Sequence, residues 1–295
     1  MRIAVLASPE SWYLRDLRRA GGARHEIVPL LFDQMTCRLE FDRCVVQSGG
    51  HDLANFDAVL VRTMPPGSLE QVVFRMDALA RYEAAGGLVL NPAKAVEAAV
   101  DKFLTSAKLS AAGLKSPRTV VCQTSDDALA AFEQLGRDVV IKPLFGSEGR
   151  GITRVSDPDL ALRAFKMLEQ MQAVVYLQEF VPHEGFDLRL FVLGKRVLGM
   201  RRQNPLDWRT NVSRGAKTES FEPDDGLKEI ALRAARAVGA SIAGVDLLPG
   251  KNGELYAIEV NAVPGWQALS RTLDLDIAAL VLEYVAEIRG KASSS

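Results

Sequence analysis

The sequence predicts a mixed α/β protein in which a parallel α/β unit precedes an α+β region. Three continuous apolar runs in the first third of the chain, 2–7, 58–62 and 88–90, have the pattern of buried parallel strands. After Asn91-Pro92 the pattern changes to helices interleaved with strands that turn at glycines. The predicted fold class is therefore α/β (α+β).

The first unit has one clear helix and no dinucleotide fingerprint. Residues 69–85 form the expected helix between the second and third strands, and Gly86-Gly87 ends it. A Rossmann-type site requires a G-x-G-x-x-G turn after the first strand. Ser8-Pro9-Glu10 stands there instead, which argues against an NAD-linked dehydrogenase.

The rest of the chain predicts longer helices and an antiparallel strand pair. One helix is expected over 93–112, ending at Gly113, and another over 126–135, ending at Gly136. Asp157 is the expected N-cap of a helix that starts with Pro158. Strands are expected at 139–142, 152–155, 174–180, 188–193 and 196–202, the last two turning at Gly194-Lys195. A further helix has an apolar face made of Leu227, Ile230, Ala231, Ala234 and Val238.

Composition indicates an ordinary globular enzyme. The 295 residues are 48% hydrophobic and 25% charged, and the formal net charge is -1. This charge argues against a protein that binds nucleic acid mainly through its phosphates. The longest apolar runs are far short of the roughly 20 residues that cross a bilayer, and the first strand begins too early for a signal peptide. We therefore expect no membrane partner, no direct nucleic-acid partner and a cytoplasmic location.

Cysteine and histidine usage limits any metal site. The chain contains three cysteines and three histidines, which are Cys37, Cys44, Cys122, His25, His51 and His183. Their spacing matches neither a zinc motif nor a redox pair, so the cysteines are expected to be reduced structural thiols. Any metal must then be held by oxygen ligands.

A glycine-rich loop is the first candidate for a binding site. Gly146, Gly149 and Gly151 fall between two apolar strands, and backbone amides in such a loop can approach phosphate oxygens closely. No G-K-[ST] follows and a strand comes next, so this is not a Walker A loop. Lys142, inside a buried-strand pattern, needs an anionic partner. The two interpretations are a lid over a nucleotide triphosphate and a structural glycine hairpin.

Oxygen donors on two neighbouring strands form the second candidate. Asp246 lies in the apolar run 242–248, and Glu259 and Asn261 lie two apart in 254–261, so this pair projects from one face. Two carboxylates and an amide suit Mg²⁺ bound with water and phosphates. The alternative is a buried, hydrogen-bonded acidic pair. The register of Asp246 against the second strand is not fixed by sequence.

Together these segments resemble the ATP-grasp superfamily, and within it the RimK-like α-L-glutamate ligases, over nearly the whole chain. The matching segments are Asp101-Lys102, Val140-Ile141-Lys142, the loop 146–151, Gln178-Glu179-Phe180, Asp187-Leu188-Arg189, Arg201-Arg202, the segment 208–215, Ala243-Gly244-Val245-Asp246 and Glu259-Val260-Asn261-Ala262-x-Pro264-Gly265. The resemblance implies an N-terminal α/β (pre-ATP-grasp) domain over 1–92, a central lid subdomain over 93–177, a C-terminal subdomain with the metal site over 178–290, and a disordered tail at 291–295.

The resemblance also implies a role for each matching residue. Nucleotide contacts are implied for Lys102, Lys142, Gly146, Ser147, Gly149, Gly151, Gln178, Glu179, Asp187, Arg209 and Asn211. Within this set, Gln178 and Glu179 match the hinge that recognises adenine, and Asp187 matches the acidic residue near the ribose. Metal ligands are implied at Asp246, Glu259 and Asn261, and a basic cluster facing the acceptor carboxylate and γ-phosphate at Arg202, Arg189 and Arg214. Glu148 departs from the pattern, because it places an acid close to phosphate.

The implied reaction is ATP-dependent ligation of a carboxylate to an amine with Mg²⁺ or Mn²⁺. Phosphorylation gives the carboxylate a leaving group, and the amine of L-glutamate then displaces phosphate from the acyl phosphate. The arginines from 189 to 214 suit an acidic substrate, and a solvated basic face is the alternative interpretation.

Several partners remain open at this point. The acceptor is expected to be an acidic small molecule or peptide: a ribosomal protein tail, citrate or N-acetylaspartate, or a pterin or deazaflavin cofactor. The string 142–147 most resembles the tetrahydromethanopterin glutamate ligase branch. A non-catalytic nucleotide-binding module is the competing class. Such a module would have lost Lys142 or one of the three metal ligands. This sequence keeps Lys142, Asp246, Glu259 and Asn261. Association into a homo-oligomer is an expectation from the resemblance alone.

Overall fold

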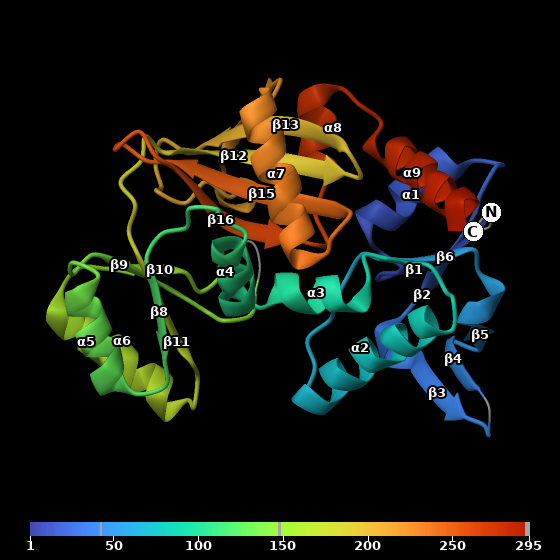
Figure 1. Cartoon of the computed structure of the whole chain (residues 1–295), viewed down its shortest axis with the longest axis horizontal. Helices are drawn as coiled ribbons and strands as arrows, with labels where there is room; N and C mark the ends of the chain where they lie inside the picture. The colour runs from blue at the N-terminus through green and yellow to red at the C-terminus, as the bar shows by residue number, and fades with distance from the viewer. Residues whose placement is uncertain (42, 147–148, 293–295) are drawn as a thin grey trace.

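The chain folds around four β-sheets. The computed structural model describes residues 1–41, 43–146 and 149–292, and the four sheets lie within them. Figure 1 shows the largest sheet in the middle, with the N-terminal elements at one end and a smaller sheet with its helices at the other. One of the two N-terminal sheets is parallel and the remaining sheets are antiparallel, which confirms the predicted mixture of α/β and α+β.

The N-terminal sheet is parallel and has the order β2-β1-β6-β7. Its elements are β1 (Arg2–Leu6), β2 (Glu26–Leu30), β6 (Ala58–Val61) and β7 (Val89–Leu90), with α1 (Trp12–Gly21) and α2 (Leu69–Ala84). The three predicted strands and the predicted helix are confirmed. Strand β2 was not predicted, because Pro29 interrupts its apolar pattern and suits only the edge of a sheet.

A second N-terminal sheet also lay outside the predictions. It consists of β3 (Met35–Leu39), β4 (Cys44–Ser48) and β5 (His51–Asp52), with the short helices η1 (Phe32–Gln34) and η2 (Leu53–Asn55) beside it. Strand β4 packs against α2. The three cysteines of the chain are free thiols, as predicted.

The predicted helix over 93–112 is wrong as a single element. The structure has α3 (Ala93–Val100) and α4 (Lys102–Ala111), separated by Asp101 in an extended conformation. The break is stable because the Asp101 carboxylate accepts a hydrogen bond from the Leu104 amide at 2.9 Å and caps α4. Thr105 Oγ1 also donates to the Ala98 carbonyl at 2.7 Å, which satisfies the end of α3. The break places Lys102 at the first turn of a new helix.

The small antiparallel sheet has the order β10-β9-β11-β8. Its elements are β8 (Thr119–Cys122), α5 (Ser125–Gln134), β9 (Val139–Lys142), β10 (Thr153–Val155), α6 (Pro158–Gln170) and β11 (Val175–Glu179). Helices α5 and α6 pack on one face through Phe132 and Phe165, which are fully buried. The opposite face carries Lys142 and Gln178 and is therefore the face available to a site.

The central sheet is antiparallel, in the order β14-β13-β12-β15-β16. Its elements are β12 (Phe186–Leu193), β13 (Arg196–Gln203), η3 (Val212–Arg214), β14 (Lys217–Phe221), α7 (Asp225–Val238), β15 (Ile242–Pro249), β16 (Leu255–Asn261), α8 (Gln267–Leu273) and α9 (Ile277–Ala292). The predicted hairpin at Gly194 is confirmed. One face packs on α7 through residues such as Leu190, Val245 and Val260. Helix α9 includes residues 291 and 292, which sequence assigned to a tail.

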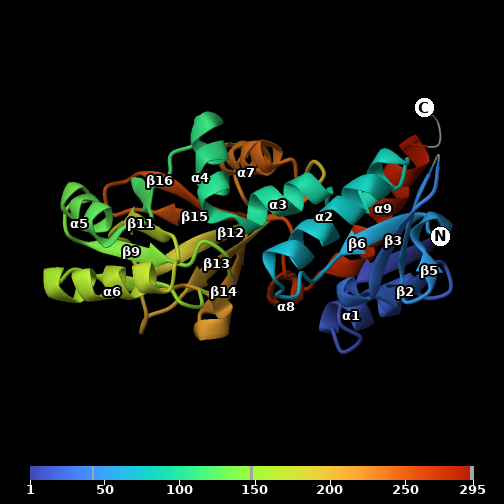
Figure 2. The same cartoon turned by 90° about the horizontal axis from the view of Figure 1, so that it is seen from below.

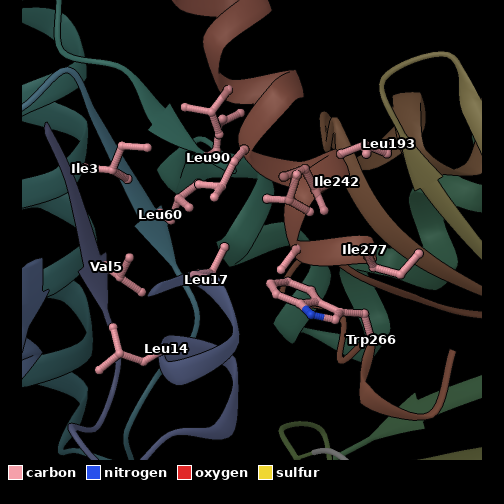
Figure 3. Packing of buried hydrophobic residues seen from close by; sticks show 14 of the residues in the cluster. Ile3, Val5, Leu14, Leu17, Leu60, Leu90, Leu193, Ile242, Trp266 and Ile277 are labelled. Carbon is pink, nitrogen blue, oxygen red and sulfur yellow. The ribbon is translucent and has the colours of Figure 1, made fainter. Parts of the chain in front are cut away.

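The C-terminal helices tie the central sheet to the N-terminal sheet. Figure 2 shows α9 running alongside the N-terminal elements, and α9 packs on α1. Figure 3 shows the shared core, in which side chains from both ends of the chain meet: Ile3, Val5, Leu14, Leu17, Leu60, Leu90, Leu193, Ile242, Trp266 and Ile277. Because one continuous apolar core spans this junction, the two sheets are held in a fixed relation. No helix among residues 1–41, 43–146 and 149–292 has the length and apolar character needed to cross a membrane.

A buried asparagine fixes the polar part of the same junction. Asn91 Nδ2 donates to the carbonyls of Ile242 at 2.6 Å and Ala262 at 2.5 Å. Its Oδ1 accepts from the amides of Ser241 at 2.9 Å and Ile242 at 3.0 Å. One side chain thus satisfies backbone groups next to two strands of the central sheet, and β15 and β16 are held in place relative to β7.

We predict that Asn91→Ala lowers the free energy of unfolding by about 3 kcal/mol, because it leaves buried carbonyl and amide groups without partners. Urea unfolding followed by circular dichroism measures this change. The exposed Asn55→Ala variant is the matched control and should be nearly neutral. A loss of less than about 1 kcal/mol in Asn91→Ala would show that the junction does not depend on this side chain.

Candidate active site

Six of the residues predicted for the site share one face of the central sheet. Cross-strand pairing places Arg189 opposite Asp246, Asp187 opposite Arg202, and Asp246 opposite Glu259. Residues that are directly opposite, or two apart on one strand, project from the same face. The face therefore carries Asp187, Arg189, Arg202, Asp246, Glu259 and Asn261. The register of Asp246, which sequence left open, is settled by this pairing.

A buried ion network connects the middle of this face. Asp246 binds Arg189 Nη1 through Oδ1 at 2.6 Å and Arg202 Nη2 through Oδ2 at 2.9 Å. Arg202 also forms a two-point contact with Asp187, at 2.8 Å from Nε and 2.5 Å from Nη2. Thr210 Oγ1 donates to Asp187 at 2.6 Å. Two arginines thus neutralise two aspartates in a site removed from water, as buried charges require.

The network keeps its central carboxylate ionised. Burial by itself would raise the pKa of Asp246, but the Arg189 and Arg202 guanidiniums outweigh burial and lower it. Burial likewise opposes the charge of Arg202, yet Asp246 and Asp187 raise its pKa above the ordinary value. Both partners therefore remain charged across the physiological range.

Gly244 makes room for Arg189. A methyl group at Gly244 would overlap the Arg189 guanidinium, because the Nη2, Cζ and Nε atoms all lie too close to the position of the added Cβ. The guanidinium reaches Asp246 only because position 244 has no side chain. In the motif Ala243-Gly244-Val245-Asp246, the glycine leaves space for Arg189 and the aspartate binds it.

Two lysines lie at the β16 edge of the face. Lys142 Nζ donates to Gln178 Oε1 at 2.6 Å, and burial lowers the Lys142 pKa to about 8 while Glu259 opposes that shift. Lys102 Nζ donates to the Gly146 carbonyl at 2.8 Å, and burial lowers its pKa too, again against Glu259. The charge of Glu259 therefore acts on both lysines, although they come from different elements. This edge concentrates positive charge next to a carboxylate.

The segment 209–214, which includes η3, is in direct contact with the glycine loop and with the residue that follows this loop. Arg214 Nη2 donates to the Gly149 carbonyl at 3.1 Å, and Arg209 Nη1 donates to the Ile152 carbonyl at 3.3 Å. The Asn211 amide lies where a Cβ of Gly149 would be. Gly149 and Gly151 have positive φ angles of 69° and 71°, which favour glycine. Arg214 is thus placed on the glycine loop and not beside Arg189 and Arg202.

Of the predicted hinge residues, Gln178 is directed into the site and Glu179 is directed away from it. Gln178 projects into the site, donating from Nε2 to Thr119 Oγ1 at 2.9 Å. Glu179 points the other way and pairs with Arg118 at 2.5 Å, and its amide donates to the Arg118 carbonyl at 2.9 Å, so its carboxylate and its amide are both used away from the site. Ser147, together with Glu148, lies outside the described residues.

The oxygen donors fit one hard divalent cation in their chemistry, and strand pairing puts them on one sheet face. Glu259 forms no hydrogen bond or ion pair with any other described residue, so its carboxylate is available. Asn261 is on the same face, with Oδ1 accepting from the Val263 amide at 2.8 Å. Asp246 uses both oxygens on arginines, but each oxygen has a second lone pair. In the part of the chain that the structure describes, no three His, Cys, Asp or Glu side chains form a metal cluster, so the amide oxygen, water and phosphate would complete the shell.

A buried arginine near the site was missed by sequence reasoning. Arg62, at the carboxyl end of β6, lies 4.1 Å from the Trp266 ring centre and 4.8 Å from that of Tyr13. Its Nη2 donates to the Pro264 carbonyl at 2.7 Å, and burial lowers its pKa to about 10. It fastens the loop after Asn261 to the N-terminal sheet. The sequence signal that could have identified it is a charged residue, Arg62, at the end of the apolar run 58–62.

Comparisons with known proteins assign this arrangement to a family. The family model of the RimK-like ATP-grasp domain matches residues 99–285. The chain is 30% identical to the tetrahydromethanopterin:alpha-L-glutamate ligase of Methanosarcina acetivorans, covering 96% of this chain and 98% of that protein. It is 29% identical to a probable alpha-L-glutamate ligase of Picosynechococcus, covering 97% and 95%.

Solved structures agree on the fold. The ATP-grasp ligase PsnB complexed with minimal precursor superposes with a TM-score of 0.77 at 23% identity, covering 97% of this chain and 98% of the other. The RimK domain protein ATP-grasp from Sphaerobacter thermophilus gives 0.72 at 25% identity, covering 97% and 100%. The chain therefore belongs to the RimK-like ATP-grasp family. It is an ATP-dependent ligase that forms C–N bonds, and the predicted ATP-grasp fold is confirmed.

We predict that Gly244→Ala destabilises the protein by about 1–3 kcal/mol, because the new methyl group displaces Arg189 from Asp246 in a packed interior. Thermal unfolding measures the effect. Gly290→Ala is the control, since a Cβ at that helical glycine meets nothing within 4 Å and alanine favours a helix. Equal melting temperatures for Gly244→Ala and the native protein would contradict the packing of Arg189 against β15.

Proposed function

We propose that the protein joins L-glutamate to an acidic acceptor through an acyl phosphate, releasing ADP and phosphate. The observation that carries the proposal is the single sheet face on which Glu259, whose charge acts on two lysines, is followed by the Asp246–Arg202 pair. Relatives named as α-L-glutamate ligases, with about 30% identity over nearly the full length, support the choice of amino acid.

The lysine edge is the place for the nucleotide. Lys102 and Lys142 supply positive charge for phosphate oxygens, and Lys102 also contacts the Gly146 carbonyl at the start of the glycine loop. Asp246, Glu259 and Asn261 would hold Mg²⁺ or Mn²⁺, which when bound neutralises charge on the transferring phosphoryl group. Gln178 and the carbonyl of Glu179 are proposed to recognise the adenine, because the Glu179 amide is already used on the Arg118 carbonyl. Arg209 and Asn211 suit the triphosphate, because they already contact the glycine loop.

The arginines suit the acceptor carboxylate. Arg202 uses Nε and Nη2 on Asp187 and Asp246, and no contact within the described residues uses its Nη1. That nitrogen and Arg189 can orient a carboxylate whose oxygen attacks the γ-phosphorus of ATP, with ADP leaving. The glutamate amine then attacks the acyl carbon, the C–O bond to phosphate breaks, and the amine loses a proton. Charge placement and orientation are sufficient, and no side-chain nucleophile takes part.

The acceptor within this class is proposed to be a pterin of the tetrahydromethanopterin type. Two relatives at 30% identity, from Methanosarcina acetivorans and Methanococcus maripaludis, are named tetrahydromethanopterin:alpha-L-glutamate ligases. A peptide acceptor is the second candidate, because the PsnB structure that shares this fold holds a precursor. The same site chemistry would serve either acceptor through a carboxylate group.

An ADP-release assay with L-glutamate, Mg²⁺ or Mn²⁺ and a panel of acidic acceptors tests the proposal. We expect ADP only when both glutamate and one acceptor are present, and a product heavier by one glutamyl unit in mass spectrometry. Glu259→Gln should reduce the rate by roughly 100-fold, because a charge that holds the metal is lost. The exposed Glu254→Gln, next to the same strand, is the control. Product formation without glutamate, or full activity of Glu259→Gln, would refute the proposal.

Nucleotide affinity should depend on pH through Lys142. Its pKa is lowered to about 8 in the nucleotide-free protein by burial, and bound phosphate favours the protonated form. Above pH 8, binding must therefore take up a proton, and the affinity for Mg-ADP falls by up to about tenfold per pH unit. Calorimetric titration between pH 7 and 9.5 measures this. Lys142→Arg remains protonated and should flatten the profile, whereas an unchanged profile would remove Lys142 from the nucleotide site.

A further inference from the structure

A polar groove lies at the edge of the central sheet opposite the lysines. It has a volume of about 590 Å³ and is lined by Thr218, Glu219, Ser220, Arg271 and Thr272, from strand β14 and helix α8. This volume is in the range of small-molecule sites. None of these residues takes part in the proposed phosphoryl transfer or acyl transfer.

Strand register connects the groove to the reactive face. Thr218 lies opposite Arg202, and Ser220 lies opposite Met200, so both side chains share the face of Arg202. The side chain of Glu219 projects to the other face, where it approaches Arg201 at 3.9 Å. Across the sheet the order on this face is thus Glu259, Asp246, Arg202 and Thr218. The lysines and the groove lie on opposite sides of the Asp246–Arg202 pair.

The groove offers a cation and hydroxyl groups. Arg271 is exposed and forms no ion pair with any described residue. With the Gln267 amide oriented to satisfy its neighbours, Oε1 accepts from Arg271 Nη2 at 3.1 Å and holds that side chain over the groove. Thr272 Oγ1 lies 2.7 Å from Thr218 Oγ1. A guanidinium beside hydroxyl groups matches a carboxylate.

We infer that this groove holds the acidic amino acid that supplies the amine, with Arg271 binding one of its carboxylates. The inference rests on the proposed function. The acyl phosphate forms beside Arg202, with the nucleotide on the lysine side, so an amine that displaces phosphate must approach from the side not occupied by ATP. The groove is on that side, one strand from Arg202. The new N–C bond forms as the C–O bond to phosphate breaks, and the proton of the amine leaves with the phosphate or to water.

Equilibrium dialysis of radiolabelled L-glutamate against the full chain saturated with Mg-ADP tests the inference, with the Mg-ADP affinity measured separately. Arg271→Ala should weaken glutamate binding by about tenfold or more and leave the Mg-ADP affinity within about twofold. Arg271→Lys keeps the positive charge but loses the two-point guanidinium contact, so its affinity for glutamate should lie between those of the native protein and Arg271→Ala. Arg81→Ala removes an exposed guanidinium from α2 and is the matched control.

The outcomes separate the inference from the proposed function. Unchanged glutamate binding in Arg271→Ala, or Mg-ADP binding by the native protein with no glutamate binding, overturns the groove as the glutamate site. Failure of the native protein to bind Mg-ADP overturns the proposed nucleotide site and the inference with it. A selective loss of glutamate binding in Arg271→Ala, absent in Arg81→Ala, supports the assignment.

Discussion

The buried contact between Arg202, Asp187 and Asp246 is the constraint around which the site is arranged. It joins three adjacent strands of the central sheet, and Arg189 closes it on the second oxygen of Asp246. Charges in such a place are tolerated only when each has a partner. The network therefore fixes the register of the strands and the direction of each guanidinium at once, and Gly244 supplies the space that Arg189 needs.

Elements outside the central sheet place the other site residues next to this network. The small sheet carries Lys142 and the glycine loop. The helix break at Asp101 places Lys102 in the first turn of α4. At the opposite side, Arg62 and Asn91 fasten the ends of β15 and β16 to the N-terminal sheet. The continuous core of Figure 3 makes that attachment rigid, so the end of β16, with Asn261, and the loop that follows it are held in place.

Much of the fold followed from the sequence, and the failures have local causes. Apolar runs such as β6 and β9 were found because a buried strand needs no alternation. The edge strand β2 was hidden by Pro29, and the two helices α3 and α4 appeared as one because Asp101 is compatible with either state until its side chain is seen to cap the Leu104 amide. For the site, the sequence predicted a glycine loop and three oxygen donors, and the structure places the donors on one sheet face. The contact of Arg214 with the glycine loop was not predicted.

The sequence by itself determined which residue types were available for the site. They are a lysine in a buried strand, carboxylates among apolar neighbours, and a glycine-rich loop. The order of these motifs along the chain is the order that characterises the family. Those features are local, because periodicity and the cost of isolated charge act within a few residues. Only the tertiary structure decided which of them meet. The pairing of Asp246 with two arginines, the effect of the Glu259 charge on two lysines, the burial of Arg62 and the groove beside Arg271 all join segments far apart in the chain. Strand register and helix packing, which set such contacts, depend on the whole core.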